Sequence, residues 1–362
     1  MPTPRALHLA STAAATVLAL GTSLGVAPSA QASGRHVVMR AVLPGESIQQ
    51  ALDAADPGDI VQLGPGTYHE SVQLTRPGVT LRGVGRQSVL TPGAQPSANA
   101  CGAAGHGICV TGTEGHRVAD VRIESLTVQG FPKNGVSGSE TDRMTVRGLL
   151  VQDNGEEGIA QEKSTRGVLV DNTARRNGQA GVFLANIAYG EGGAIDTQGA
   201  VIGDNDLSAN RIGVVVRRAR NLAVERNTIS GNCSGVFVVG DENRPRAGAL
   251  TVRDNQVTAN NAYCPPNDRL PYLQGIGIVL TGVEDTLVTR NQVRDNVGAS
   301  PMSGGVVLFR SFNGGASTGV TVRDNAVRDN GPSDLADRDT GLGDAFAART
   351  NGCLVSEPAG HC

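Results

Sequence analysis

Residues 222–232 read LAVERNTISGN, and residues 250–260 read LTVRDNQVTAN. The pattern returns as TLVTRNQVRDN over residues 286–296 and as GVTVRDNAVRDN over residues 319–330. Each unit contains two short apolar segments, and each of these segments is followed by an asparagine. Self-similarity of this kind indicates a repeat architecture rather than a globule with a unique core.

A third apolar segment, beginning with Gly-Val, completes each unit. It occurs at residues 181–184, 213–216, 235–238 and 305–308. The period is 22 residues between Asn205 and Asn227, and other units lengthen to 28–36 residues by insertion. Periods in this range predict a solenoid whose insertions leave the coil on one face.

Three short strands per coil explain the pattern physically. Strands send alternate side chains inward, and successive coils stack at about 4.8 Å with shared main-chain hydrogen bonds. Asparagine suits the corners, because it tolerates left-handed backbone angles and its amide can bond the same residue one coil away. We therefore predict an all-β, parallel β-helix of roughly ten coils, about 48 Å long at that spacing. An α/β fold would need helices between the strands, and the repeats leave no room for them.

Composition agrees with a thin interior. The sequence has 49 glycines, 3% aromatic residues and no tryptophan, so Val, Ile and Leu must fill the coil. The net charge is −3 with both signs interspersed, which gives no basic footprint for nucleic acid.

The first 32 residues read as a secretory signal peptide. Arg5 is followed by an apolar stretch at residues 6–26 and by the small-x-small site Ala30-Gln31-Ala32. No later stretch reaches the roughly 20 apolar residues that span a bilayer. We expect a secreted protein of about 330 residues that is a monomer without membrane or nucleic-acid partners.

Six cysteines suit an oxidising compartment, where disulfides persist. They form three sequence-local pairs, and we predict the pairing Cys101–Cys109, Cys233–Cys264 and Cys353–Cys362 among the 15 connectivities that six cysteines allow. A zinc site is the rival interpretation, but no Cys-x-x-Cys or His-x-x-x-His spacing accompanies the cysteines.

Residues 33–92 are predicted to be an N-terminal cap with the first coils, and residues 93–362 the repeats with their loop insertions and a disulfide-closed C-terminal end. Residues 47–55 form a short amphipathic helix with Ser47 as N-cap. Short strands follow at residues 60–63, 72–74 and 79–81. An exposed solenoid end needs such a cover.

The cap and repeats together resemble the pectin-lyase-like superfamily of right-handed parallel β-helix proteins. The resemblance is carried by SIQQAL at residues 47–52, PGDIV at 57–61, PGTY at 65–68 and VTLRG at 79–83, and by the Asn-rich repeats. It implies a right-handed β-helix. It leaves the activity open, because relatives include polysaccharide lyases, hydrolases, uronate epimerases and plain binding proteins.

One cluster of charged residues matches the needs of a uronate lyase or epimerase. Such an enzyme requires a cation over the sugar carboxylate and a base. If the Gly-Val strands stack in register, Glu162, Arg217 and Asp241 project outward on neighbouring coils, with Lys163 and Arg218 beside them. Glu162, Lys163, Arg217 and Asp241 are the candidate catalytic residues, and Arg218 is a candidate for substrate binding. The alternative is a surface salt-bridge ladder, which contributes little to stability.

Two further motifs have structural explanations. Gly105-His106-Gly107 resembles part of the polygalacturonase signature, but that family's aspartates are missing ahead of it, and His106 lies between Cys101 and Cys109. Tyr68-His69-Glu70 is similar to a catalytic segment of alginate epimerases, yet it lies in the cap, where the superfamily carries a structural Thr-Tyr turn.

We predict no definite cofactor. Calcium is the ion that the Asp-Asn repeats would suit, and it needs 6 to 8 oxygen ligands. Asp254, Arg290 and Asp324 occupy equivalent corners, however, so acidic residues alternate with arginine. This alternation favours charge compensation between coils.

The insertions are the candidate binding elements, because loops on a rigid scaffold commonly carry function. Tyr189, Tyr263 and Tyr272 lie in them and are the candidate sugar-binding rings, although they could equally pack the loops onto the coil. The insertions fall at residues 186–198, 241–247, 261–274, 297–303 and 311–318.

An outward apolar stripe accompanies these loops. Phe183, Val215 and Phe237 would be exposed unless the loops cover them, and a stripe between looped walls is a groove. We therefore expect a secreted protein that binds an extracellular acidic polysaccharide and processes it as a lyase or epimerase. The alternative is a non-catalytic carbohydrate- or surface-binding protein. A β-helix for copper-enzyme maturation is disfavoured by only four Met and six His.

Overall fold

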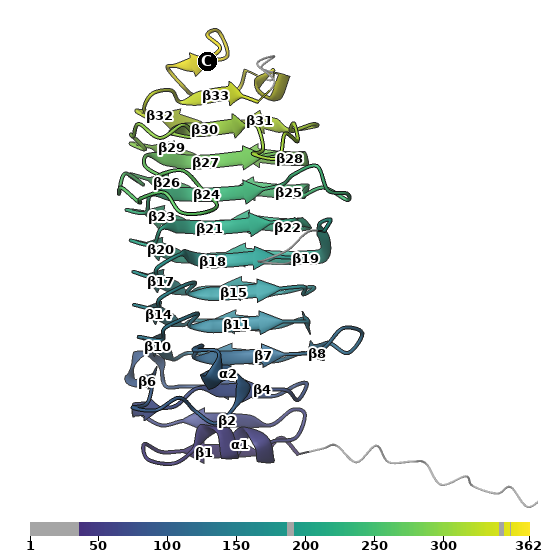
Figure 1. The fold of residues 1–362 in the computed structure, drawn as a ribbon, viewed down its shortest axis with the longest axis vertical. Helices are drawn as coiled ribbons and strands as arrows, with labels where there is room; N and C mark the ends of the chain where they lie inside the picture. The colour runs from purple at the N-terminus through teal and green to yellow at the C-terminus, as the bar shows by residue number, and fades with distance from the viewer. Residues whose placement is uncertain (1–35, 187–191, 340–343, 348) are drawn as a thin grey trace, which may run out of the picture. The chain divides into compact units, whose positions relative to one another are not determined.

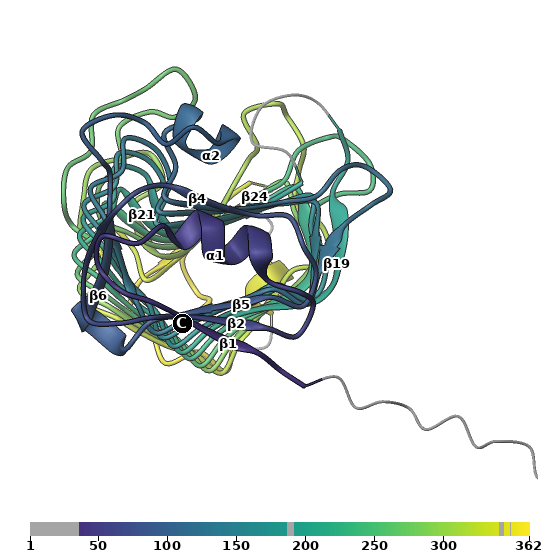
Figure 2. The same cartoon turned by 90° about the horizontal axis from the view of Figure 1, so that it is seen from below.

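Three parallel sheets build the unit formed by Val37–Cys362 in the computed structural model, which describes residues 36–186, 192–339, 344–347 and 349–362. The chain visits the sheets in turn, so that strands adjacent within a sheet are one coil apart in sequence. Figure 1 shows the coils stacked from β1 to β33, and Figure 2 looks along the stack. The predicted signal peptide at residues 1–32 lies outside the described residues.

Sheet A, the first to be entered, is 11-stranded. Its strands are β1 (Met39–Val42), β2 (Ile60–Leu63), β5 (Thr80–Arg82), β9 (Arg122–Glu124), β13 (Thr145–Arg147), β16 (Val168–Val170), β19 (Ile195–Gly203), β22 (Ala219–Glu225), β25 (Gly248–Arg253), β28 (Glu284–Thr289) and β31 (Thr321–Arg323).

Sheet B is 10-stranded and holds the second short segment of each repeat. Its strands are β3 (Gly66–His69), β6 (Ser88–Thr91), β10 (Thr127–Gln129), β14 (Leu150–Gln152), β17 (Thr173–Arg175), β20 (Asp206–Ser208), β23 (Thr228–Ser230), β26 (Gln256–Thr258), β29 (Gln292–Arg294) and β32 (Ala326–Arg328).

Sheet C is 11-stranded and holds the Gly-Val segments. Its strands are β4 (Val72–Leu74), β7 (Ile108–Thr111), β11 (Val136–Ser139), β15 (Ile159–Glu162), β18 (Ala180–Ala185), β21 (Ile212–Arg217), β24 (Ser234–Val239), β27 (Ile276–Thr281), β30 (Gly304–Phe309), β33 (Leu335–Arg338) and β34 (Ser356–Glu357). A small two-stranded sheet pairs β8 (Val118–Ala119) with β12 (Thr141–Asp142).

Side chains that are distant in sequence line up as columns inside the coil. Val224 pairs with Val252, Val252 with Val288, and Val288 with Val322, and all four are fully buried. This stacking confirms the predicted all-β solenoid of three strands per coil. The interior is filled by Val, Ile and Leu columns, as the low aromatic content predicts.

Two asparagine ladders run along the corners on either side of sheet B. In each ladder the side-chain amide of one asparagine donates to the Oδ1 of the asparagine in the next coil; the distance from Asn255 to Asn291 is 2.9 Å and that from Asn260 to Asn296 is 2.9 Å. The ladder between sheets A and B comprises Asn172, Asn205, Asn227, Asn255, Asn291, Asn325 and Asn351. The ladder between sheets B and C comprises Asn154, Asn177, Asn210, Asn232, Asn260, Asn296 and Asn330.

One detail of the corner prediction was wrong. The left-handed backbone angle belongs to the residue before the ladder asparagine, with φ of 54° at Arg226, 57° at Asp254 and 55° at Arg290. The preceding residue makes the turn, so the asparagine side chain can point inward and receive its neighbours' N–H groups. The charged residues at equivalent corners form ion pairs between coils, as predicted. Arg290 Nε lies 2.8 Å from Asp254 Oδ1.

The N-terminal cap also matches its prediction. The helix α1 (Ile48–Ala54) begins after Ser47, whose hydroxyl accepts the N–H of Gln50, and it buries Ile48 and Leu52. The Tyr68 hydroxyl donates to the Val42 and Gly64 carbonyls at 2.8 and 3.0 Å, which gives it the structural role expected of the turn. The remaining helices are short: η1 (Gly85–Gln87), α2 (Ala100–Ala103) and η2 (Asp344–Phe346).

The three predicted disulfides, Cys101–Cys109, Cys233–Cys264 and Cys353–Cys362, are all formed. The first encloses His106, whose Nδ1 accepts the N–H of Asn134 at 3.1 Å and whose burial lowers its pKa. The second joins the start of β24 to a long insertion, and this link shapes the candidate site.

Candidate functional site

The outer face of sheet C carries a second apolar cluster, separate from the core of the coil. Phe183 pairs with Val215, Val215 with Phe237, and Phe237 with Val279, so these side chains form one outward column. The column is buried, with 7% of Phe183 and 1% of Phe237 exposed. The apolar stripe predicted from the sequence therefore exists, and other parts of the chain cover it.

Loops cover the stripe from both edges of sheet C. Insertions at residues 240–247 and 310–318 leave the corner between sheets C and A, whereas those at 259–275 and 295–303 leave the corner between sheets B and C. Between them lies a pocket of about 510 Å³. The pocket is floored by Phe183, Val215 and Phe237.

The arm, residues 261–275, forms one wall of this pocket. The Cys233–Cys264 disulfide fixes its base, and Cys264 and Leu273 exchange backbone N–H···O bonds of 3.0 Å each. At the tip, the Asn267 side chain accepts the N–H groups of Arg269 and Leu270 at 3.0 and 2.9 Å. A closed turn on a covalently fixed base therefore holds the tip in place.

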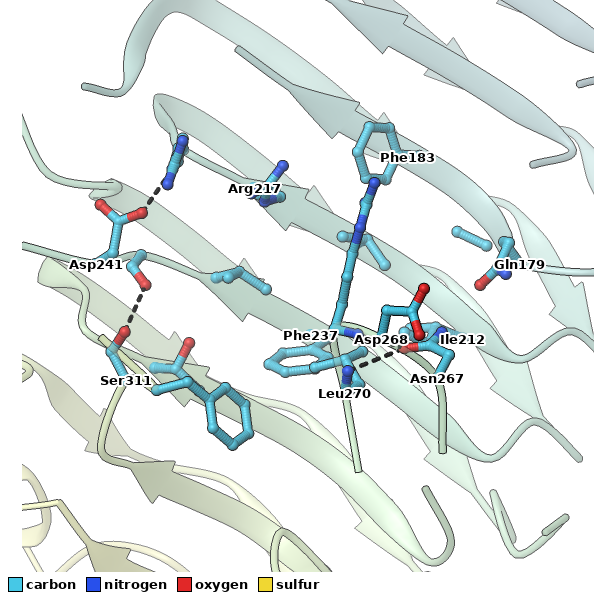
Figure 3. Close-up of a pocket in the computed structure, with 18 of the residues that line it drawn as sticks. Gln179, Phe183, Ile212, Arg217, Phe237, Asp241, Asn267, Asp268, Leu270 and Ser311 are labelled. Atoms are coloured by element: carbon cyan, nitrogen blue, oxygen red, sulfur yellow. Dashed lines mark hydrogen bonds and ion pairs between the residues drawn. The ribbon is translucent and has the colours of Figure 1, made fainter. Parts of the chain in front are cut away.

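The arm tip reaches back over coils that precede it in the stack. The arm follows β26, yet its tip and residues next to β15 and β18 line the same pocket. Leu270 and Leu273 pack with the outer apolar cluster, which anchors the arm against sheet C. Figure 3 shows Asn267, Asp268 and Leu270 on one side of Phe237, with Asp241 and Ser311 on the other.

A buried ion pair stiffens the opposite wall. Arg218 Nε lies 2.5 Å from Asp241 Oδ2, and the two side chains are only 4% and 7% exposed. Asp241 Oδ1 also accepts the N–H of Asn243 at 3.0 Å. The Ser311 hydroxyl donates to the Gly240 carbonyl at 3.3 Å and joins the next loop to this wall.

Glu157 lines the pocket at the end nearest the N-terminal coils. It precedes β15, and the N–H of the next residue donates to the Ala180 carbonyl at 2.8 Å, so Glu157 lies beside an apolar part of the floor. Burial raises its pKa to about 7, with further upward contributions from the nearby carboxylates of Glu156 and Glu162, while Arg269 acts in the opposite direction. Glu157 therefore changes charge near neutral pH.

The predicted catalytic residues are only partly brought together. Arg217, Arg218 and Asp241 line the pocket. Glu162 occupies the same outward column as Arg217, with Ala185 between them, and thus lies two coils away. Glu162 and the adjacent Lys163 do not line the pocket. Arg218 and Asp241 bind each other.

The predicted sugar-binding tyrosines lie at the base of the arm. The rings of Tyr263 and Tyr272 are 5.7 Å apart, and the Tyr272 hydroxyl donates to the Ala299 carbonyl of the neighbouring loop. Tyr263 is 61% exposed. Neither ring lines the pocket, and Tyr189 lies outside the described residues.

Sequence reasoning missed the residues that the arm brings in. Asp268 and Arg269 line the pocket only because the arm folds back over earlier coils. Glu157 did leave a signal in the sequence. Its position corresponds to Ala180 and Ile212 in the next two coils, so aligning the repeats shows a carboxylate next to two apolar positions.

Metal-binding groups and membrane-spanning helices are both absent from the described residues. No group of three or more His, Cys, Asp or Glu side chains in that part of the chain is arranged to share a metal ion. No helix among the same residues has the length and apolar character needed to cross a bilayer.

Comparison with known proteins is consistent with this geometry. Residues 97–257 match the family model described as a right handed beta helix region. No curated protein sequence matches the chain. The catalytic domain of a GH87 alpha-1,3-glucanase, solved with tetrasaccharides, has a TM-score of 0.53 at 14% identity, with 82% of this chain and 60% of that chain covered.

Two other solved structures are similar. XylC in complex with xylose has a TM-score of 0.52 at 10% identity, with 81% of this chain and 69% of that chain covered. The A-module of mannuronan C-5 epimerase AlgE6 from Azotobacter vinelandii has a TM-score of 0.45 at 21% identity, with 77% and 88% covered. The family model, together with the glucanase and XylC structures, shows that the protein is a right-handed parallel β-helix solenoid. Its fold is the pectin-lyase-like fold, as the sequence resemblance predicted.

Proposed function

We propose that the protein is a secreted polysaccharide-binding protein that holds a glycan segment in the pocket on sheet C. The supporting observation is the pocket itself, in which the parts of Phe183, Val215 and Phe237 that the loops leave uncovered lie between polar walls. A sugar ring has the matching character, with an apolar face and a rim of hydroxyl groups. Pockets with an apolar lining and a few placed polar groups are typical ligand sites.

Charges in the pocket support an acidic glycan. Arg217, Arg218 and Arg269 place three guanidinium groups in the lining, and Arg218 is paired with Asp241. Guanidinium groups match carboxylates in geometry and charge. Among the acidic lining residues, Glu157 is partly uncharged near pH 7. The guanidinium groups in the lining suit a polysaccharide that contains uronate sugars.

Secretion is supported by the three disulfides, since such bonds persist in oxidising compartments. The glucanase and XylC structures, which share the fold, were solved with bound sugars. That similarity supports the ligand class by analogy of fold only.

Binding to a panel of polysaccharides tests this proposal. Alginate, polygalacturonate and hyaluronan represent acidic glycans, and dextran serves as the neutral comparison. Phe312 lines the pocket and is 56% exposed, so Phe312→Ala should weaken binding of an acidic glycan about tenfold without unfolding the coil. Leu354 is 64% exposed near the C-terminal end, and Leu354→Ala is the matched control. Failure of all three acidic glycans to bind, or equal affinity of the two variants, would refute the proposal.

Lyase or epimerase action on an acidic glycan is the second candidate. It is favoured by the shared column of Glu162 and Arg217, with Lys163 beside it. In this proposal Arg217 neutralises the uronate carboxylate and Lys163 or Glu162 moves the proton, while Asp241 and Arg218 shape the wall. Unsaturated uronides, detected by ultraviolet absorbance, would mark a lyase; their persistence in Lys163→Ala and Glu162→Ala would exclude these residues.

Tyr263 and Tyr272 are proposed to extend the sugar-binding surface beyond the pocket. Their rings form a partly exposed platform at the base of the arm. Loss of glycan affinity in Tyr263→Ala would support this role. Unchanged affinity would leave the rings with a packing role.

A calcium site is a separate proposal. Glycan binding measured with and without a chelator tests it.

A further inference from the structure

We propose that Glu157 is a proton donor that hydrolyses a glycosidic bond of the polysaccharide held in the pocket. This inference rests on the proposed glycan-binding function and adds a reaction to it. Three observations support it. They are the position of the Glu157 carboxyl group in the pocket, the ion pairs formed by the other acidic residues of the lining, and the arm tip that lines the same pocket.

Glu157 is the acidic member of a column in which the next two residues are apolar. The corresponding places in the next two coils are held by Ala180 and Ile212, and both of these also line the pocket. A carboxyl group at the edge of an apolar floor contributes nothing to packing. A sugar held in the pocket beside Ala180 and Ile212 would bring a bridging oxygen towards this edge, where a proton donor is needed.

Ion pairs occupy the other two acidic side chains of the lining. Lys133 Nζ pairs with Glu156, and Arg218 pairs with Asp241. Among the described residues, neither Glu157 nor Asp268 forms an ion pair. Of the four acidic side chains that line the pocket, these two are therefore left for chemistry.

The surroundings of Glu157 raise the pKa of its carboxyl group. Burial is the main cause, Glu156 and Glu162 add repulsion, and Arg269 at the arm tip opposes them, so the pKa is about 7. A general acid works best when its pKa lies near the working pH. Two carboxyl groups in different environments commonly divide the roles of acid and base.

The reaction balances as a hydrolysis. Glu157 gives its proton to the glycosidic oxygen, and the bond from that oxygen to the anomeric carbon breaks. A water molecule bonds to the anomeric carbon and loses a proton to a second carboxylate, a role we assign to Asp268 because it lines the same pocket. Asp268 then releases its proton to solvent and Glu157 regains one from solvent, so water is the only co-reactant consumed.

The test uses the full secreted chain and the polysaccharide of the panel that it binds most tightly. Binding is measured by calorimetry, and cleavage by new reducing ends together with ultraviolet absorbance. We expect reducing ends without the absorbance of an unsaturated sugar, and a rate that falls as pH rises above about 7. Glu157→Gln should lower the rate at least 100-fold while glycan affinity stays within a few-fold.

Glu114→Gln, in the exposed turn at Thr113–His116, is the matched control and should cleave at the wild-type rate. A bound glycan that yields no reducing ends from pH 5 to 8 would overturn this inference and leave the binding function intact. Cleavage by Glu157→Gln at the wild-type rate would overturn it as well, and so would products with unsaturated ends. Absence of binding to every glycan would instead refute the proposed function, and the inference with it.

Discussion

The smallest unit that holds the coil together is one ladder asparagine. The amide of Asn255 donates to Asn291 Oδ1 and to the Val224 carbonyl, both at 2.9 Å, and its own Oδ1 accepts the backbone N–H and the amide of Asn227 at 3.0 and 2.9 Å. Its side chain is only 1% exposed. Because water cannot replace these bonds, every partner of Asn255 depends on it.

Asn255→Ala should therefore lower the free energy of unfolding by about 2–4 kcal/mol, since it leaves buried donors without acceptors. Urea unfolding followed by circular dichroism measures the change. The control is Gln256→Ala, one residue further along and exposed, which should change stability by less than about 0.5 kcal/mol. Equal effects of the two variants would show that the ladder does not stabilise the corner.

Glu157 has a second consequence at this scale, which is independent of any ligand. Its folded pKa of about 7 lies above the value of 4.5 for an unperturbed glutamate, because burial disfavours the charged form. The folded state therefore holds this proton more tightly than the unfolded state. Its contribution to stability is fully present below pH 4.5 and is lost as pH rises to about 7.

The wild-type protein should thus lose up to about 3 kcal/mol relative to Glu157→Gln between these pH values. The difference in unfolding free energy between the two proteins, measured at several pH values, isolates this group from all others. A difference that does not vary with pH would mean that the carboxyl group is solvated in the folded state.

At the scale of elements, the arm is the part whose position the sequence could not show. Its length, its tyrosines and Cys264 are visible in the chain, and they led to the correct disulfide with Cys233. Its direction depends on packing, because Leu270 and Leu273 meet an apolar face built by earlier coils. Asp268 and Arg269 consequently could not be assigned to the pocket, and the predicted cluster of Glu162, Lys163, Arg217 and Asp241 included only part of its lining.

Removal of the arm's disulfide tests the importance of this element. In the double variant Cys233→Ala and Cys264→Ala, the arm should separate from the floor, and glycan affinity should fall by about tenfold or more. The coil should still form, because the ladders do not involve these residues. Far-ultraviolet circular dichroism and glycan binding measure the two effects. Unchanged affinity would indicate that Leu270 and Leu273 alone hold the arm.

At the scale of the whole β-helix unit, the sequence was most informative because its signals repeat. One column of the interior appears in four successive repeats, as Val224, Val252, Val288 and Val322. The spacing of these residues in the sequence therefore predicts the coil. The pocket has no such redundancy. Glu157 occurs once in its column and becomes visible only when its place is compared with that of Ala180 and Ile212.

A stack of equivalent coils should tolerate removal of a whole coil but not of part of one. Deletion of residues 205–226 joins Asp204 to Asn227, so a corner residue still precedes a ladder asparagine. This shortened protein should fold and unfold cooperatively while losing the pocket, because β21 is removed. Deletion of residues 205–215 breaks the register and should give an unfolded or aggregated chain. If both deletions fold equally well, the columns do not determine the fold.

The two asparagine ladders also restrict where this protein can change. They hold the two corners beside sheet B in place. The long insertions begin after the ladder asparagines and lie on the side of sheet C. The segment between Asn260 and Gly275 can therefore be replaced by one of different length without disturbing the asparagine ladders. The coil can thus carry different binding loops on the face of sheet C, and grafting a new loop there should change the binding specificity.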